Sequence, residues 1–145
     1  MSKKKILLVD DSKVTRRSIS ILLEKHDFEA LALDNAEDLV TFADRYTDVS
    51  LILLDINLPG MDGLTALGYI NQLSTINHIP VIMITGDSDM EIVKKAASLN
   101  VVDYVLKPYI PSKLLARIER ALNPQEVDAE TATTPNPENV ESTEE

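Results

Sequence analysis

Three aspartates in this chain follow short apolar runs, so each places a charge at the end of a segment that is otherwise suited to a protein core. Asp10 and Asp11 follow the run 6–9, and Asp55 follows the run 51–54. Carboxylates that lie within a few ångströms of one another repel, unless a cation neutralises them. Oxygen ligands without His or Cys select a hard cation, of which Mg²⁺ is the expected one. The three aspartates therefore predict a magnesium site, provided that the fold brings them together.

Two further polar side chains stand at the ends of apolar runs. Thr85 ends the run 81–85, and Lys107 follows the run 103–106. A carboxylate beside Mg²⁺ can attack a phosphoryl group in line, and the charge that develops on the phosphoryl oxygens needs donors and cations already in place. The ammonium of Lys107 and the hydroxyl of Thr85 would supply them. The residue types therefore indicate phosphoryl chemistry as well as metal binding.

The elements that must position these residues follow from two kinds of periodicity. Continuous apolar runs are typical of parallel strands buried on both faces, and segments with helical spacing lie between them. The clearest helix has Leu114, Ile118, Ala121 and Leu122 at i, i+4, i+7 and i+8. We expect strands at 5–10, 28–33, 51–56, 81–85 and 103–106, and helices at about 12–26, 35–46, 63–74, 88–99 and 111–123.

Helix starts are marked by capping residues. Ser12, Asn35 and Ser88 are expected to cap three of the helices, and Pro111-Ser112 opens the last one. The resulting order of five βα units predicts an α/β fold, a doubly wound parallel sheet covered by helices on both faces. Sites in open sheets of this kind lie beyond the carboxyl ends of the strands, so we expect the polar strand-end residues to meet at one edge.

Composition and charge divide the chain into two parts. Its 145 residues are 44% hydrophobic, which suits one compact domain. Residues 125–145 contain seven acidic residues and no Lys or Arg, alongside proline and threonine, and this composition is typical of a disordered tail or linker. We therefore expect a folded domain over 1–124. Its 17 acidic and 14 basic residues give a net charge of −3, which does not favour direct binding of nucleic acid.

The absence of cysteine excludes disulfides and thiolate metal sites and fits a reducing compartment, so we expect the cytoplasm. The apolar runs are too short for a membrane span, and the run behind Lys3–Lys5 is too short for a signal peptide. We expect no membrane partner.

Four stretches, LLVDDS, LLDINLPGMDGL, VIMITG and DYVLKPY, occur in order at the expected strand ends. Together they resemble the receiver domain of two-component response regulators, with single-domain chemotaxis and sporulation regulators most similar in organisation. The resemblance covers residues 4–123. It implies a flavodoxin-like (βα)5 fold whose five-stranded parallel sheet has the order 2-1-3-4-5.

By position, the resemblance implies that Asp55 accepts the phosphoryl group. It implies that Asp10, Asp11, Asp55 and the backbone carbonyl of Asn57 coordinate Mg²⁺. Lys107 would pair with the phosphoryl group or, before phosphorylation, with Asp55. The resemblance also suggests a cis peptide bond between Lys107 and Pro108.

The resemblance also implies a switch and an output surface. Thr85 would be the switch hydroxyl, and Tyr104 the aromatic whose rotamer follows it, whereas Asn57 and Asp87 border the path of the hydrolytic water and tune the phosphoryl lifetime. The output face would comprise the loop after 85, the helix 88–99, the strand 103–106 and the helix 111–123. A histidine kinase or histidine phosphotransfer protein would dock near Val14.

The resemblance therefore predicts a phosphoacceptor that assists its own phosphorylation and dephosphorylation and is not an enzyme. Taken singly, Asp10 or Asp11 could be a helix cap and Tyr104 a packed strand residue. A flavodoxin-like electron carrier would need a Ser-, Thr- and Gly-rich phosphate cradle where this chain has DDSKVTR. An aspartyl phosphotransferase would need D-x-D where Ser12 stands, and no G-x-x-x-x-G-K motif is present. The remaining alternative is a receiver-like interaction module that works without phosphorylation.

Overall fold

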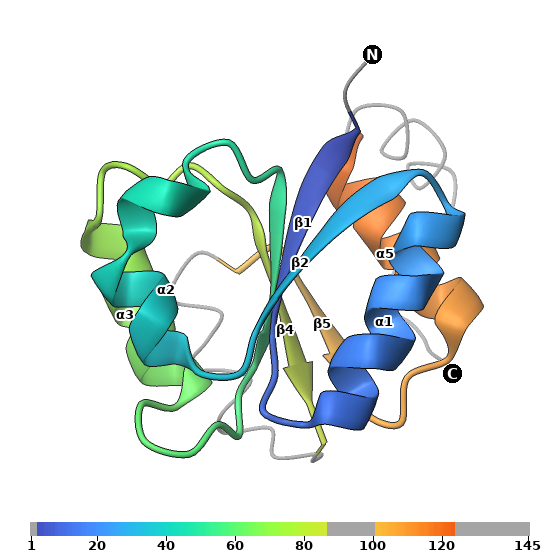
Figure 1. Cartoon of the computed structure of the whole chain (residues 1–145), viewed down its shortest axis with the longest axis horizontal. Coiled ribbons are helices and arrows are strands. Elements are labelled where there is room, and N and C mark those ends of the chain that lie inside the picture. Colours follow the sequence, from blue (N-terminus) through green and yellow to red (C-terminus); the bar gives the residue numbers. More distant parts are fainter. Residues whose placement is uncertain (1–2, 87–100, 124–145) are drawn as a thin grey trace, which may run out of the picture.

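The computed structural model describes residues 3–86 and 101–123, which form a parallel sheet between two layers of helices. Figure 1 shows α1 and α5 on one face of the sheet and α2 and α3 on the other. The strands are β1 (Lys4–Val9), β2 (Phe28–Leu33), β3 (Leu51–Asp55), β4 (Val81–Thr85) and β5 (Asp103–Leu106). The helices are α1 (Lys13–Lys25), α2 (Ala36–Thr41), α3 (Gly63–Gln72) and α5 (Pro111–Leu122), with a 3₁₀ helix at Ala43–Tyr46.

The sheet has the strand order β2-β1-β3-β4-β5, and every neighbouring pair is parallel. This confirms the expected order 2-1-3-4-5. Strand β2 lies on one side of β1, and β3 lies on the other side. The direction in which successive strands are added to the sheet therefore reverses at β1. In open sheets of this kind the crevice at such a reversal, outside the carboxyl ends of the strands, is where a ligand site forms.

Alternating side chains of the strands build two separate cores. On the α2 and α3 face, Leu7, Val9, Ile52 and Leu54 pack with Leu67 of α3. The opposite cluster combines strand residues with α1 and α5, and its main members are Ile6, Leu8, Leu51, Leu53, Ile82, Ile84, Ile19, Leu23, Leu114 and Ile118. Every residue of β3 and β4 is buried, so the apolar runs that predicted parallel strands reflect burial from both sides.

Two predicted caps are confirmed. The Ser12 side chain accepts a hydrogen bond from the Thr15 amide at 3.2 Å, and that of Asn35 accepts one from the Asp38 amide at 2.8 Å. Pro111 opens α5 as predicted. Ser88 and the helix expected over 88–99 lie outside the described residues.

The predicted helix over 35–46 is wrong in its second half. Helix α2 ends at Thr41, the chain turns at Phe42 with φ −111° and ψ 34°, and a 3₁₀ helix follows. Val40 and Thr41 are β-branched residues with low helix propensity, which favours an early end. The Arg45 guanidinium lies 4.3 Å from the centre of the Phe42 ring and stabilises the turn. The predicted helix over 63–74 also ends early, at Gln72.

Within residues 3–86 and 101–123, the helices are all too short or too polar to cross a membrane.

Candidate functional site

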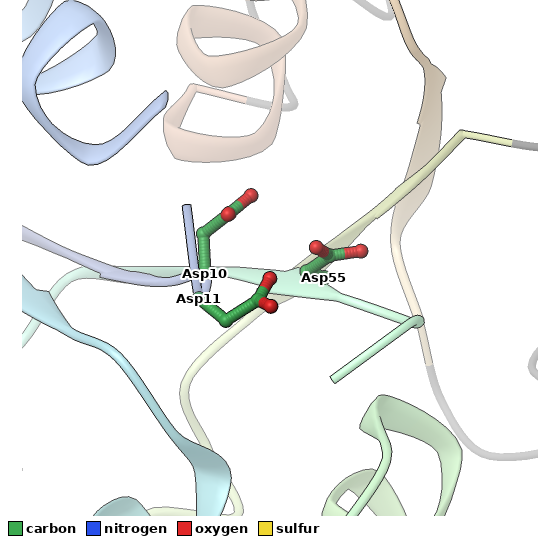
Figure 2. A group of neighbouring side chains, drawn as sticks. All are labelled: Asp10, Asp11 and Asp55. Atoms are coloured by element: carbon green, nitrogen blue, oxygen red, sulfur yellow. The ribbon is translucent and has the colours of Figure 1, made fainter. Parts of the chain in front are cut away.

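The three aspartates meet at the carboxyl edge of the sheet, as the sequence predicted. Asp10 directly follows β1 and Asp55 is the last residue of β3, and these neighbouring strands pair with Val9 opposite Leu54. One carboxylate oxygen from each of Asp10, Asp11 and Asp55 lies within 4.8 Å of the other two. Figure 2 shows the three carboxyl groups around a common space. Asp10 and Asp55 are buried, whereas Asp11 is exposed.

Backbone amides fix one oxygen of each buried carboxylate. The Ser12 amide donates to Oδ1 of Asp10 at 2.8 Å, and the Asn57 amide donates to Oδ1 of Asp55 at 3.0 Å. In addition, Nη1 of Arg16 donates to the backbone oxygen of Asp10 at 2.9 Å. The Oδ2 atoms of Asp10 and Asp55 are therefore available to a charged side chain or a metal ion.

Lys107 supplies the positive charge of the site. Its Nζ atom lies 2.9 Å from Oδ2 of Asp55 and 3.3 Å from Oδ2 of Asp10. Its amide donates to the backbone oxygen of Thr85 at 2.6 Å, which joins the start of this loop to β4. The Lys107-Pro108 peptide bond is cis.

Burial and neighbouring charges have opposite effects on the pKa values of Asp55 and Lys107. Burial raises the pKa of Asp55 above its ordinary value, although the hydrogen bonds from Lys107 and Asn57 partly offset the effect. Burial also opposes the charge on Lys107, but the hydrogen bond and the negative charges of Asp55 and Asp10 outweigh it, and the pKa of Lys107 is raised. The Lys107 ammonium thus pairs with Asp10 and Asp55, and within the described part of the chain Asp11 forms no ion pair within 4.0 Å, so the carboxylates outnumber the ammonium that pairs with them.

The donor set fits Mg²⁺. Oδ2 of Asp10 is buried and, among the described residues, accepts no hydrogen bond; its charged neighbour is Nζ of Lys107 at 3.3 Å, which it shares with Asp55. One shared ammonium only partly offsets the cost of burying the Asp10 and Asp55 carboxylates, and a metal ion would reduce that cost further. Three carboxylates that offer oxygen ligands within 4.8 Å of one another suit a hard divalent ion. We conclude that Asp10, Asp11 and Asp55 can hold Mg²⁺.

Three other predicted site residues come from β4, β5 and the segment after β3. Thr85 ends β4 and is 2% exposed, and Tyr104 of β5 is half-buried against the core on the α2 and α3 side. Asn57 is exposed. Val14 in the first turn of α1 is 78% exposed. Asp87 lies outside the described residues.

The sequence analysis did not identify three residues that support the site. Arg16 holds the Asp10 backbone, and Glu37 accepts a hydrogen bond from the Met61 amide at 3.0 Å. A Cβ atom added to Gly63 would lie 2.2 Å from the backbone oxygen of Asp55, so α3 starts in direct contact with the end of β3. A Gly one residue after Asp62, the cap of α3, is a visible signal, but a glycine at such a position is also typical of a turn and does not by itself indicate a close contact.

Comparisons with known proteins agree with this geometry. Residues 6–119 match the response regulator receiver domain family, so the chain belongs to that family. It is 32% identical over 123 residues to two-component response regulator ORR13 of Oryza sativa subsp. japonica, which covers 85% of this chain and 98% of that protein. It is 35% identical over 127 residues to regulatory protein AtoC of Escherichia coli strain K12, which covers 87% of this chain but 27% of AtoC.

Solved structures give the same result for the fold. A response regulator receiver protein from Pseudomonas putida superposes with a TM-score of 0.77 at 26% identity, covering 83% of this chain and 98% of that one. A CheY-like receiver domain protein from Methanospirillum hungatei gives a TM-score of 0.76 at 28% identity, covering 88% and 99%.

The chain is therefore a response regulator receiver domain of two-component signalling. Its family consists of signalling phosphoacceptor domains rather than conventional enzymes, and uses Mg²⁺ held by acidic residues. Membership also implies that it interacts with a histidine kinase or a histidine phosphotransfer protein.

Proposed function

We propose that Asp55 is the phosphoacceptor of this receiver domain. The observation that carries the proposal is the position of its Oδ2 atom, which lies 2.9 Å from Nζ of Lys107 at an edge shared with Asp10 and Asp11. Oδ1 of Asp55 is held by the Asn57 amide at 3.0 Å. The nucleophilic carboxylate is thus oriented before any phosphodonor arrives.

In the proposed reaction, a carboxylate oxygen of Asp55 forms a bond to phosphorus. The P–N bond of the donor phosphohistidine breaks, and the departing imidazole nitrogen keeps the electron pair of that bond. The ammonium of Lys107, freed from its ion pair with Asp55, then pairs with the phosphoryl oxygens. The Thr85 hydroxyl lies at the end of the neighbouring strand β4 and is proposed as the second donor.

Asp10, Asp11 and Asp55, with the backbone carbonyl of Asn57, are the proposed Mg²⁺ ligands. When bound, Mg²⁺ would neutralise these carboxylates and the phosphoryl oxygens. In a separate second step, water attacks phosphorus, the bond between phosphorus and the Asp55 oxygen breaks, and inorganic phosphate leaves with the Asp55 carboxylate restored. We propose that Asn57 and Asp87 tune the rate of this step, and that the chain thereby assists both its own phosphorylation and dephosphorylation.

We propose that phosphorylation shifts the chain between two conformations through Thr85 and Tyr104. The output face would include β5 and α5, together with the predicted helix 88–99. A groove of about 430 Å³ between β5 and α5 supports this choice, since Tyr104 lines it beside the exposed apolar residues Leu106 and Ile110. The upstream phosphodonor protein would dock near Val14, beside the aspartates. We also propose a cytoplasmic location, which the lack of cysteine supports.

We further propose that the receiver unit comprises residues 1–124 and that 125–145 are an acidic tail or linker outside it. The family match to residues 6–119 and the change in composition after residue 124 support this division.

Intact-protein mass spectrometry tests the phosphoacceptor. The full chain is incubated with Mg²⁺ and acetyl phosphate, beside an Asp55→Asn variant and a chelator control. We expect one phosphoryl adduct on the unchanged chain and none in either control. No adduct, also with a histidine kinase as donor, would refute the proposal and favour an interaction module that works without phosphorylation.

A further inference from the structure

Glu37 contacts the loop that follows Asp55 from a different part of the fold. It lies in the first turn of α2, and its Oε2 atom accepts a hydrogen bond from the amide of Met61, 24 residues away in sequence, at 3.0 Å. Among the described residues, the Glu37 carboxylate forms no ion pair within 4.0 Å, so this amide is its identified partner.

The backbone of the loop is shaped to receive this carboxylate. Gly60 has a φ of +74°, in the left-handed region that favours glycine. A Cβ atom added there would lie 2.4 Å from Oε2 of Glu37, closer than atoms can pack. The carboxylate therefore occupies the space that a side chain at position 60 would need, and it does so while it bonds to the next amide along the chain.

The loop is otherwise held by its own strand and helix. The Asn57 amide bonds to Asp55, and the amides of Leu58 and Gly63 both donate to the backbone oxygen of Ile56. Asp62 caps α3. Within the described part of the chain, the Glu37 side chain is the group from another element that bonds to the backbone of residues 57–62.

A simpler role for Glu37 would be its charge. An acidic residue in the first turn of a helix interacts favourably with the helix dipole, and the effect needs no partner in the loop. A negative charge near a metal site also attracts a cation over some distance. Both effects depend on charge, whereas the contact with Met61 depends on an oxygen acceptor at one position. A carboxamide keeps the acceptor and removes the charge, so the two roles can be separated.

We propose that Glu37 is a positioning residue for the magnesium site, because its bond to Met61 fixes the Gly60 turn and thereby the Asn57 end of the loop. This inference rests on the proposed function, in which the Asn57 carbonyl completes the metal shell. Residues that orient a metal ligand without touching the metal change its affinity, and Glu37 is placed to act in this way from α2.

The test uses the full chain labelled with ¹⁵N. Exchange of the Met61 amide hydrogen is measured without Mg²⁺, and the Mg²⁺ dissociation constant is then measured by titration of the amide signals. The variants are Glu37→Ala and Glu37→Gln. Glu24→Ala, at an exposed position of α1, is the control for loss of an acidic residue elsewhere.

We expect Glu37→Ala to accelerate Met61 exchange and to raise the Mg²⁺ dissociation constant about threefold to tenfold, in line with the loss of one exposed hydrogen bond. Glu37→Gln should keep the protection of Met61 and stay within about twofold of the unchanged chain, as should Glu24→Ala.

Two results would overturn the inference. Equal Mg²⁺ affinity in Glu37→Ala and the unchanged chain would mean that the contact does not position the site. Equal losses in Glu37→Gln and Glu37→Ala would assign the effect to charge. If the unchanged chain bound no Mg²⁺, the proposed function itself would fail and this inference with it, a result distinct from the other two.

Discussion

Gly63 allows a close contact between α3 and the residue proposed to accept the phosphoryl group. A Cβ atom at this position would lie 2.2 Å from the backbone oxygen of Asp55 and 2.8 Å from Cα of Ile56. Both neighbours are backbone atoms at the end of a buried strand, so they cannot rotate away as a side chain could. Gly63→Ala would need a displacement of about 0.8 Å to reach even 3.0 Å, and the interior is too closely packed to absorb this without cost.

The expected loss can be estimated from two opposing effects. Alanine favours the helix over glycine by about 0.5–1 kcal/mol. Forcing extra volume into a packed site costs about 1–3 kcal/mol, and weakening the hydrogen bond from the Gly63 amide to Ile56 adds about 1 kcal/mol. We therefore expect Gly63→Ala to lower the free energy of unfolding by about 2–3 kcal/mol.

Gly68 provides a matched control in the same helix. An added Cβ there would have no heavy atom within 4 Å, so only helix propensity changes. We expect Gly68→Ala to raise the free energy of unfolding by about 0.5–1 kcal/mol. The same substitution thus has opposite signs at two positions five residues apart.

Urea unfolding followed by far-ultraviolet circular dichroism measures both variants. With a slope of about 2 kcal/mol per molar urea, the midpoint of Gly63→Ala should fall by about 1–1.5 M. Phosphorylation by acetyl phosphate should also slow in Gly63→Ala, because the backbone of Asp55 moves, and not in Gly68→Ala. A Gly63→Ala variant as stable as the unchanged chain would refute the steric argument.

Three further outcomes follow from individual contacts. The hydrogen bond from Lys5 lowers the pKa of Asp48 below its ordinary 3.8, so this pair stabilises the fold above pH 3.8 and the contribution disappears as the pH falls through the lowered pKa. The difference in unfolding free energy between Asp48→Asn and the unchanged chain should therefore shrink in acid urea titrations, and a constant difference would contradict the pairing. Mg²⁺ should raise the thermal midpoint of the unchanged chain. In Asp10→Asn, the midpoint without metal should be equal or higher and the response to Mg²⁺ should be lost, as scanning calorimetry can measure; a retained response would exclude Asp10 as a ligand. Arg16→Met removes the bond to the Asp10 backbone and should lower the free energy of unfolding by about 1 kcal/mol, whereas an unchanged urea midpoint would show that water replaces it.

The sequence was sufficient to predict the sheet and the meeting of its strand-end residues. Runs such as 51–54 and 81–84 are apolar on both faces, and the helical segments between them favour a parallel sheet that is covered on both sides. Once the strands are parallel, Asp10, Asp55 and Lys107 must lie at one edge. The positions of the strands can be predicted from sequence because each depends on residues that are adjacent in the chain.

The supporting contacts could not be predicted in the same way. Helix α2 ends early at Thr41 because Val40 and Thr41 have low helix propensity. This effect is small, and the apolar pattern continues past residue 41, so the sequence predicted a longer helix. Glu37 and Met61 are joined by the packing of α2 near the loop, and nothing in either sequence segment indicates the other. The close approach of Gly63 to Asp55 likewise depends on how two backbone segments lie in space, and a glycine in the sequence does not indicate it.

The residues that define the site come from strands at the beginning, middle and end of the folded part. Asp10 follows β1, Asp55 ends β3 and Lys107 follows β5, and β4 lies between the last two strands. Asp10 and Asp55 become neighbours when β1 pairs with β3, and Lys107 joins them only after β4 and β5 have been added, which requires contacts between distant parts of the chain. A chain in which β4 and β5 have not yet joined the sheet therefore lacks the complete charge cluster. If Asp55 is the acceptor, phosphorylation distinguishes folded molecules from unfolded ones, and a signal enters only through chains in which β1, β3, β4 and β5 are assembled.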